Sequence, residues 1–135
     1  MGQVAGCVLD AELFYRTGQT AECFVALEEA VRRFDALPYD EPHGWLMPPR
    51  QTIGALLTEQ GEFERAKAVY AQDLELFPRN PWSLAGLQIC CEQTADPKLP
   101  QVTEELEKAL AIADAEIGTS CACALEDWGR KCKRC

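Results

Sequence analysis

The strongest constraint on the fold is the stretch RQTIGALLTEQGEFERAKAVYAQDLELFPRNP, residues 50–81 of a chain of 135 residues. Before Gly61, apolar side chains recur at the i, i+3 and i+4 spacing of a helix face, at Ile53, Leu56 and Leu57. After Gly61 a second face of this kind is formed by Phe63, Ala66, Val69, Tyr70, Leu74 and Phe77. The stretch therefore predicts two antiparallel helices joined by a turn at Gly61.

The end of this stretch predicts where a third helix begins. Pro78 stops the second helix, because proline cannot continue the backbone hydrogen bonding. Asn80 is a favourable N-cap residue, and Pro81 suits the first position of a helix. Small residues at Gly54 and Ala66 would let the paired helices approach closely.

The order and spacing of six residues in this stretch resemble the tetratricopeptide repeat, a helix–turn–helix unit of about 34 residues. The motif requires a small residue, a glycine, an aromatic, an alanine, a second aromatic and a proline, here Gly54, Gly61, Phe63, Ala66, Tyr70 and Pro78. The resemblance implies an all-α fold of antiparallel helix–turn–helix repeats, stacked as a short right-handed α-solenoid. A generic helical hairpin is the alternative.

The neighbouring stretches match the motif less closely. Upstream, Ala11, Phe14, Gly18 and Leu27 occupy equivalent places, while Thr20 replaces an aromatic. Downstream, the expected third turn ADPKLP has no glycine. The resemblance gives about three repeats, 4–36, 47–80 and 81–115, in a domain of residues 1–117, followed by a cysteine-rich basic tail, 118–135, that is predicted to be flexible.

The linker between the first two repeats, ALPYDEPHGWLMPP, is longer than a repeat turn requires. It is similar to the C-terminal repeats of longer, functionally unassigned bacterial tetratricopeptide proteins, which implies that the chain is either the terminal piece of a longer array or complex or a shortened relative of such proteins. Trp45 and Leu46 either fill the gap between repeats or belong to a loop that reaches over the groove edge. His43, the one histidine, is interpreted as a solvated side chain rather than a ligand or base.

The resemblance implies that a peptide or partner protein binds in a concave groove lined by the first helix of each repeat. Aligning the repeats places these candidates on that groove: Glu12, Tyr15, Gln51, Thr58, Trp82, Ile89 and Glu92. Glu12 and Glu92 would favour a basic ligand. Tyr15 and Trp82 are either binding anchors or packing residues.

Charge and hydropathy exclude several classes of function. A net charge of −9, with four of the thirteen Lys and Arg residues in the last fifteen positions, argues against binding of a nucleic-acid backbone. No stretch approaches the ~20 apolar residues of a membrane span, and the N-terminus lacks the basic region of a signal peptide. We therefore expect a cytoplasmic protein, whose eight cysteines are thiols or metal ligands rather than disulfides.

The tail offers the alternative function, binding or handling of zinc or copper by thiolates. Its candidate ligands are Cys121, Cys123, Cys132 and Cys135, although the C-x-C spacing of the first pair departs from usual zinc sites. A disordered thiol tail and redox pairing remain open. Outside the tail, small buried apolar positions are predicted for Cys7, Cys23, Cys90 and Cys91.

No catalytic motif is recognisable in the sequence. A nucleotide-binding loop, a nucleophile elbow and a Ser-His-Asp set are all missing from it. We therefore expect a binding protein and no enzyme, with no cofactor apart from the alternative of a zinc or copper ion.

Overall fold

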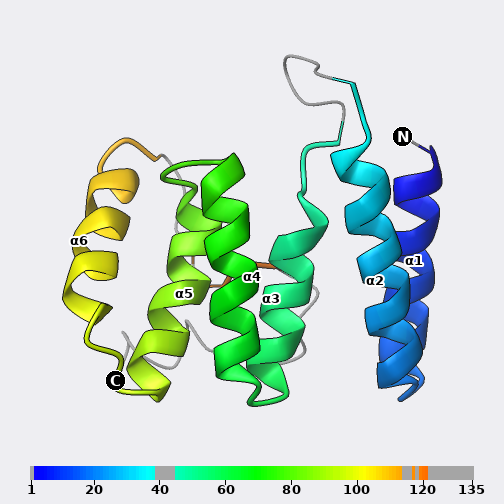
Figure 1. The fold of residues 1–135 in the computed structure, drawn as a ribbon, viewed down its shortest axis with the longest axis horizontal. Coiled ribbons are helices and arrows are strands. Elements are labelled where there is room, and N and C mark those ends of the chain that lie inside the picture. Colours follow the sequence, from blue (N-terminus) through cyan, green and yellow to red (C-terminus); the bar gives the residue numbers. More distant parts are fainter. Residues whose placement is uncertain (1, 39–44, 114–116, 118, 122–135) are drawn as a thin grey trace.

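The computed structural model describes residues 2–38, 45–113, 117 and 119–121. These residues contain helices and connections but no strand, in agreement with the expected all-α class. The helices are α1 (Gly2–Arg16), α2 (Thr20–Asp35), α3 (Pro49–Glu59), α4 (Phe63–Leu76), α5 (Pro81–Gln93) and α6 (Leu99–Leu110). They lie side by side in chain order, and each packs on the next (Figure 1). In addition, α3 contacts α5, so the second and third helix pairs share a face.

The three helix pairs turn with the same backbone geometry. Gly18 and Gly61 have φ angles of +79° and +77°, and Ala95 takes the corresponding place in the third pair with φ +51°. In each turn the next residue donates its N–H to a carbonyl five residues earlier, as Glu62 does to Leu57 at 2.9 Å and Asp96 to Cys91 at 2.9 Å. This is the Schellman pattern of helix ends. The third turn therefore keeps the left-handed conformation without the glycine that usually occupies it.

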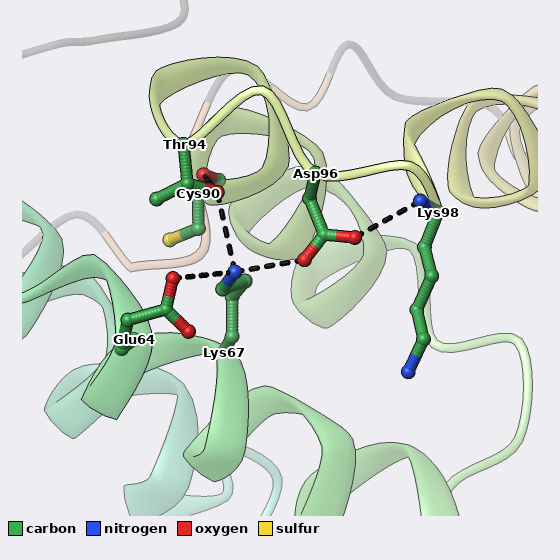
Figure 2. A network of polar contacts seen from close by, with 6 residues as sticks. All are labelled: Glu64, Lys67, Cys90, Thr94, Asp96 and Lys98. Carbon is green, nitrogen blue, oxygen red and sulfur yellow. Dashed lines mark hydrogen bonds and ion pairs between the residues drawn. The ribbon is translucent and has the colours of Figure 1, made fainter.

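A polar network holds the third turn against α4 (Figure 2). Lys67 Nζ lies 2.8 Å from an oxygen of Asp96 and 2.8 Å from one of Glu64, and it donates to Thr94 Oγ1 at 3.2 Å. Asp96 in turn accepts the backbone N–H of Lys98 at 2.9 Å. These contacts raise the pKa of Lys67, chiefly through the hydrogen bond to Asp96, and lower the pKa of Asp96. The network thus fixes the α5–α6 connection relative to the second helix pair.

The main core lies between the first and second helix pairs and extends to α5. Its buried members include Leu27, Leu56, Leu57, Ala66 and Tyr70. Ala66 is fully buried, as the expected close approach of α3 and α4 requires. A second cluster joins α5 to α6 through Leu84, Ala85, Leu106 and Ala109.

The predicted start of the third pair is confirmed, and it includes a buried carboxyl group. Asn80 caps α5 by accepting the Trp82 N–H at 3.1 Å, with Pro81 at the first helical position. Asp73 of α4 accepts from Ser83 Oγ at 2.5 Å and from Asn80 Nδ2 at 3.1 Å. Burial raises the pKa of Asp73, and its hydrogen bonds and the nearby Arg50 offset this rise only in part.

The junction between the first two pairs is held at both ends of the linker. Arg50 of α3 donates two parallel hydrogen bonds to the Asp35 carboxylate, at 2.7 and 2.6 Å. Phe34 packs on Phe77 with ring centroids 6.2 Å apart. A cavity of about 330 Å³ lies between α2, α3 and α4 beside this junction.

The interpretation of Leu46 as filler of the inter-repeat gap is wrong. Its side chain is 78% exposed, while Trp45 is half-buried. The paired Phe34 and Phe77 rings, together with Arg50, occupy the junction that Leu46 was expected to fill. His43 lies outside the described residues. No helix in the described part of the chain is both long and apolar enough to cross a membrane.

Candidate functional site

Helix α3 is buried on all sides along most of its length. Every residue from 51 to 58 is buried, including the polar Gln51 and Thr58, which are 6% and 3% exposed. Packing on α2, α4 and α5 covers only part of its circumference. The rest is covered by residues from the C-terminal part of the chain.

Residues 117 and 119–121, here called the covering segment, lie across α3 and α5. Ser120 Oγ lies 2.5 Å from the Tyr70 hydroxyl and donates to the carbonyl oxygen of Gln51 at 3.2 Å. Cys121 Sγ lies 3.5 Å from Thr52 Oγ1. Ser120 and Cys121 are 2% and 1% exposed, so these contacts exclude solvent.

The surface under this segment, here called the α3–α5 face, combines small, polar and aliphatic side chains. Its members are Gln51, Thr52, Ala55, Thr58, Gly86 and Ile89. Between this face and Thr119 and Ser120 remains a cavity of about 10 Å³, about the space that a single water molecule needs. The covering segment therefore fits the face closely.

Thr119 gives the covering segment its local shape. Its hydroxyl donates to the Cys121 carbonyl at 3.2 Å and lies 3.5 Å from the Cys121 N–H. Such contacts between a hydroxyl and the backbone two residues on stabilise a turn. This turn presents the Ser120 side chain to α3.

Tyr70 reaches the α3–α5 face from the opposite side, through a gap between α3 and α5. Gly54 and Gly86 line this gap, and a Cβ atom at either one would lie within 2.4 Å of the ring. The hydroxyl therefore emerges on the face where Ser120 lies. Burial raises the pKa of Tyr70 well above its usual value, so the phenol stays protonated and can donate a hydrogen bond.

Two of the predicted groove residues, Gln51 and Thr58, belong to the α3–α5 face and lie under or beside the covering segment. Gln51 contributes its carbonyl oxygen to Ser120, whereas the Thr58 hydroxyl donates to the Gly54 carbonyl at 2.8 Å and contacts Cys90 Sγ at 3.3 Å. A third, Ile89, is half-buried beside Thr119.

The other four candidates do not converge on this face. Tyr15 is buried and donates its hydroxyl to Glu59 at 2.9 Å, and burial raises its pKa to about 12. Glu12 pairs with Arg16 on the surface of α1 at 2.8 Å. Trp82 is 40% exposed and Glu92 is exposed. Its burial favours the packing role for Tyr15 over the role of a binding anchor.

The cysteines fall into two groups. Cys23, Cys90 and Cys91 are buried free thiols and Cys7 is a half-buried one, so three of the four have the expected buried places. Cys121 is disulfide-bonded, which differs from the expected thiol, and a disulfide sulfur is not a thiolate ligand. Cys123, Cys132 and Cys135 lie outside the described residues. Among the described residues no group of three or more metal-ligating side chains is found.

Ser120 and Tyr70 were not recognised from the sequence as residues of a site. The sequence places Tyr70 on an apolar helix face and Ser120 in the tail, residues 118–135, that is predicted to be flexible. The covering segment differs from that expectation, because Ser120 and Cys121 are packed on α3. The one local signal was the pair of glycines, Gly54 and Gly86, at equivalent places in α3 and α5.

Comparisons with protein-family models, curated proteins and solved structures find no match for this chain. The α3–α5 face and its covering segment are therefore the basis for inferring its function.

Proposed function

We propose that this chain is a protein-interaction scaffold, a short right-handed α-solenoid of the tetratricopeptide kind, whose α3–α5 face receives a non-helical segment of a partner protein. The observation that supports this proposal is the covering segment itself, a short non-helical stretch held on the face by hydrogen bonds to Tyr70 and Gln51. A surface that accommodates one non-helical segment has the shape and polar groups to accommodate another.

The composition of the face suits a peptide better than a rigid domain. Ala55, Gly86 and the two threonines have short side chains, which allow a peptide backbone to come close to the helices. The net charge of −9 favours a basic or neutral partner over an acidic one. In this proposal the chain acts in the cytoplasm by binding another protein, and it binds neither nucleic acid nor a membrane surface.

The proposal is tested by selecting peptides from a random library against the full-length chain with Ser120→Arg, which should displace the covering segment from the face, and mapping the selected peptides by NMR. Binding on the α3–α5 face predicts amide shift changes at Ala55, Thr58, Gly86 and Ile89, with little change in α6. Ile89→Lys should weaken the selected peptides at least tenfold. Val25→Lys, on the exposed surface of α2, is the matched control and should leave their affinity unchanged.

The proposal fails if no peptide is selected. It fails equally if the selected peptides shift amides elsewhere and tolerate Ile89→Lys as well as they tolerate Val25→Lys.

A further inference from the structure

The proton positions around Ser120 can be assigned from the hydrogen-bond geometry. A serine hydroxyl has one proton to donate. Ser120 Oγ donates it to the Gln51 carbonyl at 3.2 Å, because a carbonyl oxygen can only accept. The Tyr70 hydroxyl, 2.5 Å from Ser120 Oγ, must therefore donate to it. The α3–α5 face thus offers one donor and one acceptor, which together match a hydroxyl group.

This pair of partners discriminates against other small side chains. An alanine in place of Ser120 would remove one hydrogen-bond partner of the buried Tyr70 hydroxyl and leave it with Thr58, and the loss of a hydrogen bond at a buried polar group is costly. A large side chain would meet the small space between α3 and α5, where Tyr70 already fills the gap at Gly54 and Gly86. A small hydroxyl side chain satisfies both restrictions.

A second contact fixes the position of the segment along the face. Ile117, three residues before Ser120, packs against the cluster formed by Leu84, Ala85, Leu106 and Ala109. This contact partly buries an aliphatic side chain at the α5–α6 end of the face, while Ser120 is held over α3. The two anchors lie on different helix pairs and set the direction of the segment.

We infer that the α3–α5 face recognises non-helical segments of the form aliphatic-x-x-Ser, in which Tyr70 and the Gln51 carbonyl bind the serine hydroxyl. The chain's own Ile117 and Ser120 are the resident example of this ligand, and they compete with a partner segment. This inference rests on the proposed function and specifies the ligand of the same face.

Competition from the resident segment sets what a binding experiment can detect. A covalently attached ligand acts at an effective concentration in the millimolar range, so a free peptide of similar sequence binds weakly while the segment is in place. Ser120→Arg should release the segment, because a guanidinium group cannot be buried between Tyr70 and Gln51. Ser120 lies outside all six helices, so we expect this variant to keep the helical fold.

The test uses a fluorescein-labelled peptide of residues 116–122 with Cys121→Ala, titrated by anisotropy with the full-length chain under reducing conditions. Ser120→Arg in the chain should tighten binding at least about tenfold, as the loss of a competing tethered segment requires. The same peptide with Ser120→Ala should bind the Ser120→Arg chain about tenfold more weakly, because the Tyr70 hydroxyl then lacks its partner.

Tyr70→Phe in the Ser120→Arg chain tests the assigned donor. It should abolish the preference for the serine peptide over the alanine peptide. Tyr15→Phe is the matched control, because this hydroxyl is also buried and hydrogen-bonded but contacts Glu59 and Gln60 instead. The control should leave the preference unchanged.

Circular dichroism would verify that each variant is folded, and Ile117→Asp provides a second way to release the segment. The inference is overturned if serine and alanine peptides bind equally, or if neither Ser120→Arg nor Ile117→Asp increases binding. Should library-selected peptides still bind the α3–α5 face in that case, the proposed function would stand without this ligand class. If no peptide binds at all, both are wrong.

Discussion

Tyr70 packs its ring against the backbone of Gly86, so closely that a Cβ atom on this glycine would lie 2.2 Å from Cζ of the ring. Gly54 borders the same ring from α3, where a Cβ atom would lie 2.4 Å away. The ring cannot move away from one glycine without approaching the other. One side chain of α4 thereby sets the separation of α3 and α5 and places a hydroxyl on the face that they form.

Gly86→Ala should destabilise the fold by about 1–3 kcal/mol, because an added methyl group in a filled space forces side chains and backbone apart. Gly54→Ala should act in the same direction. Chemical denaturation would measure both free energies of unfolding. Gly6→Ala is the control: nothing lies within 4 Å of its Cβ position, so this helical glycine should gain up to about 1 kcal/mol. Stability unchanged in Gly86→Ala would contradict the placement of the ring.

Ala95→Gly should stabilise the chain. Ala95 has φ +51°, and an L-residue in this left-handed region costs about 1–2 kcal/mol that glycine does not pay. The greater freedom of glycine in the unfolded chain offsets about 0.4–1 kcal/mol of this gain. We expect a net increase of about 0.5–1 kcal/mol in the free energy of unfolding. The reverse substitution, Gly61→Ala at φ +77°, should destabilise by a similar amount, and a loss of stability in Ala95→Gly would disprove the assigned turn.

Asp73 should make stability depend on pH in the acid range. Burial raises its pKa in the folded state above the unfolded value of about 3.9, so folding favours the protonated carboxyl. The contribution of Asp73 to stability is complete below the unfolded pKa and is lost as the pH rises through the folded pKa. The free energy of unfolding, measured from pH 3 to 8, should therefore fall with rising pH relative to Asp73→Asn.

Glu75→Gln, an exposed position on the same helix, controls for the loss of one negative charge. Its difference from the parent should change little over the same pH range. The opposite result would contradict this prediction: the parent chain would become more stable relative to Asp73→Asn as the pH rises.

Buried thiols should be unreactive in the folded protein. Burial raises the pKa of Cys23 to about 11, and it also raises the pKa values of Cys90 and Cys91. Because the thiolate is the reactive form, iodoacetamide at pH 8 should modify Cys7 well before these three, and all four together in 6 M guanidinium. Peptide mass spectrometry would assign each site. Labelling of native Cys23 at the rate of Cys7 would show that α2 is not packed as described.

The helices were predictable because their signals are local. The spacing of Ile53, Leu56 and Leu57 and the cap at Asn80 depend only on residues a few positions apart, and both are found in the structure. The turn at Ala95 was harder, since its sequence lacks glycine. Its conformation is supported by Lys67 and Asp96, which are 29 residues apart in the sequence.

Most of the site could not be predicted from the sequence, because its residues come from distant parts of the chain. Ser120 meets Gln51 across 69 positions and Tyr70 across 50. Nothing in the residues around Ser120 indicates such a contact, and the cysteines and basic residues that follow it suggested a separate tail. The predicted burial of Leu46 was wrong for a related reason. Its apolar side chain indicated burial, but Phe34 and Phe77 already fill the junction.

The paired hydrogen bonds between Arg50 and Asp35 join the last residue of α2 to the start of α3. Both ends of the intervening linker are thereby anchored, and the spacing of the first two helix pairs does not depend on how many residues the linker contains. A short tag or a reporter domain inserted there should be tolerated, which makes this the natural point at which to join the chain to other modules.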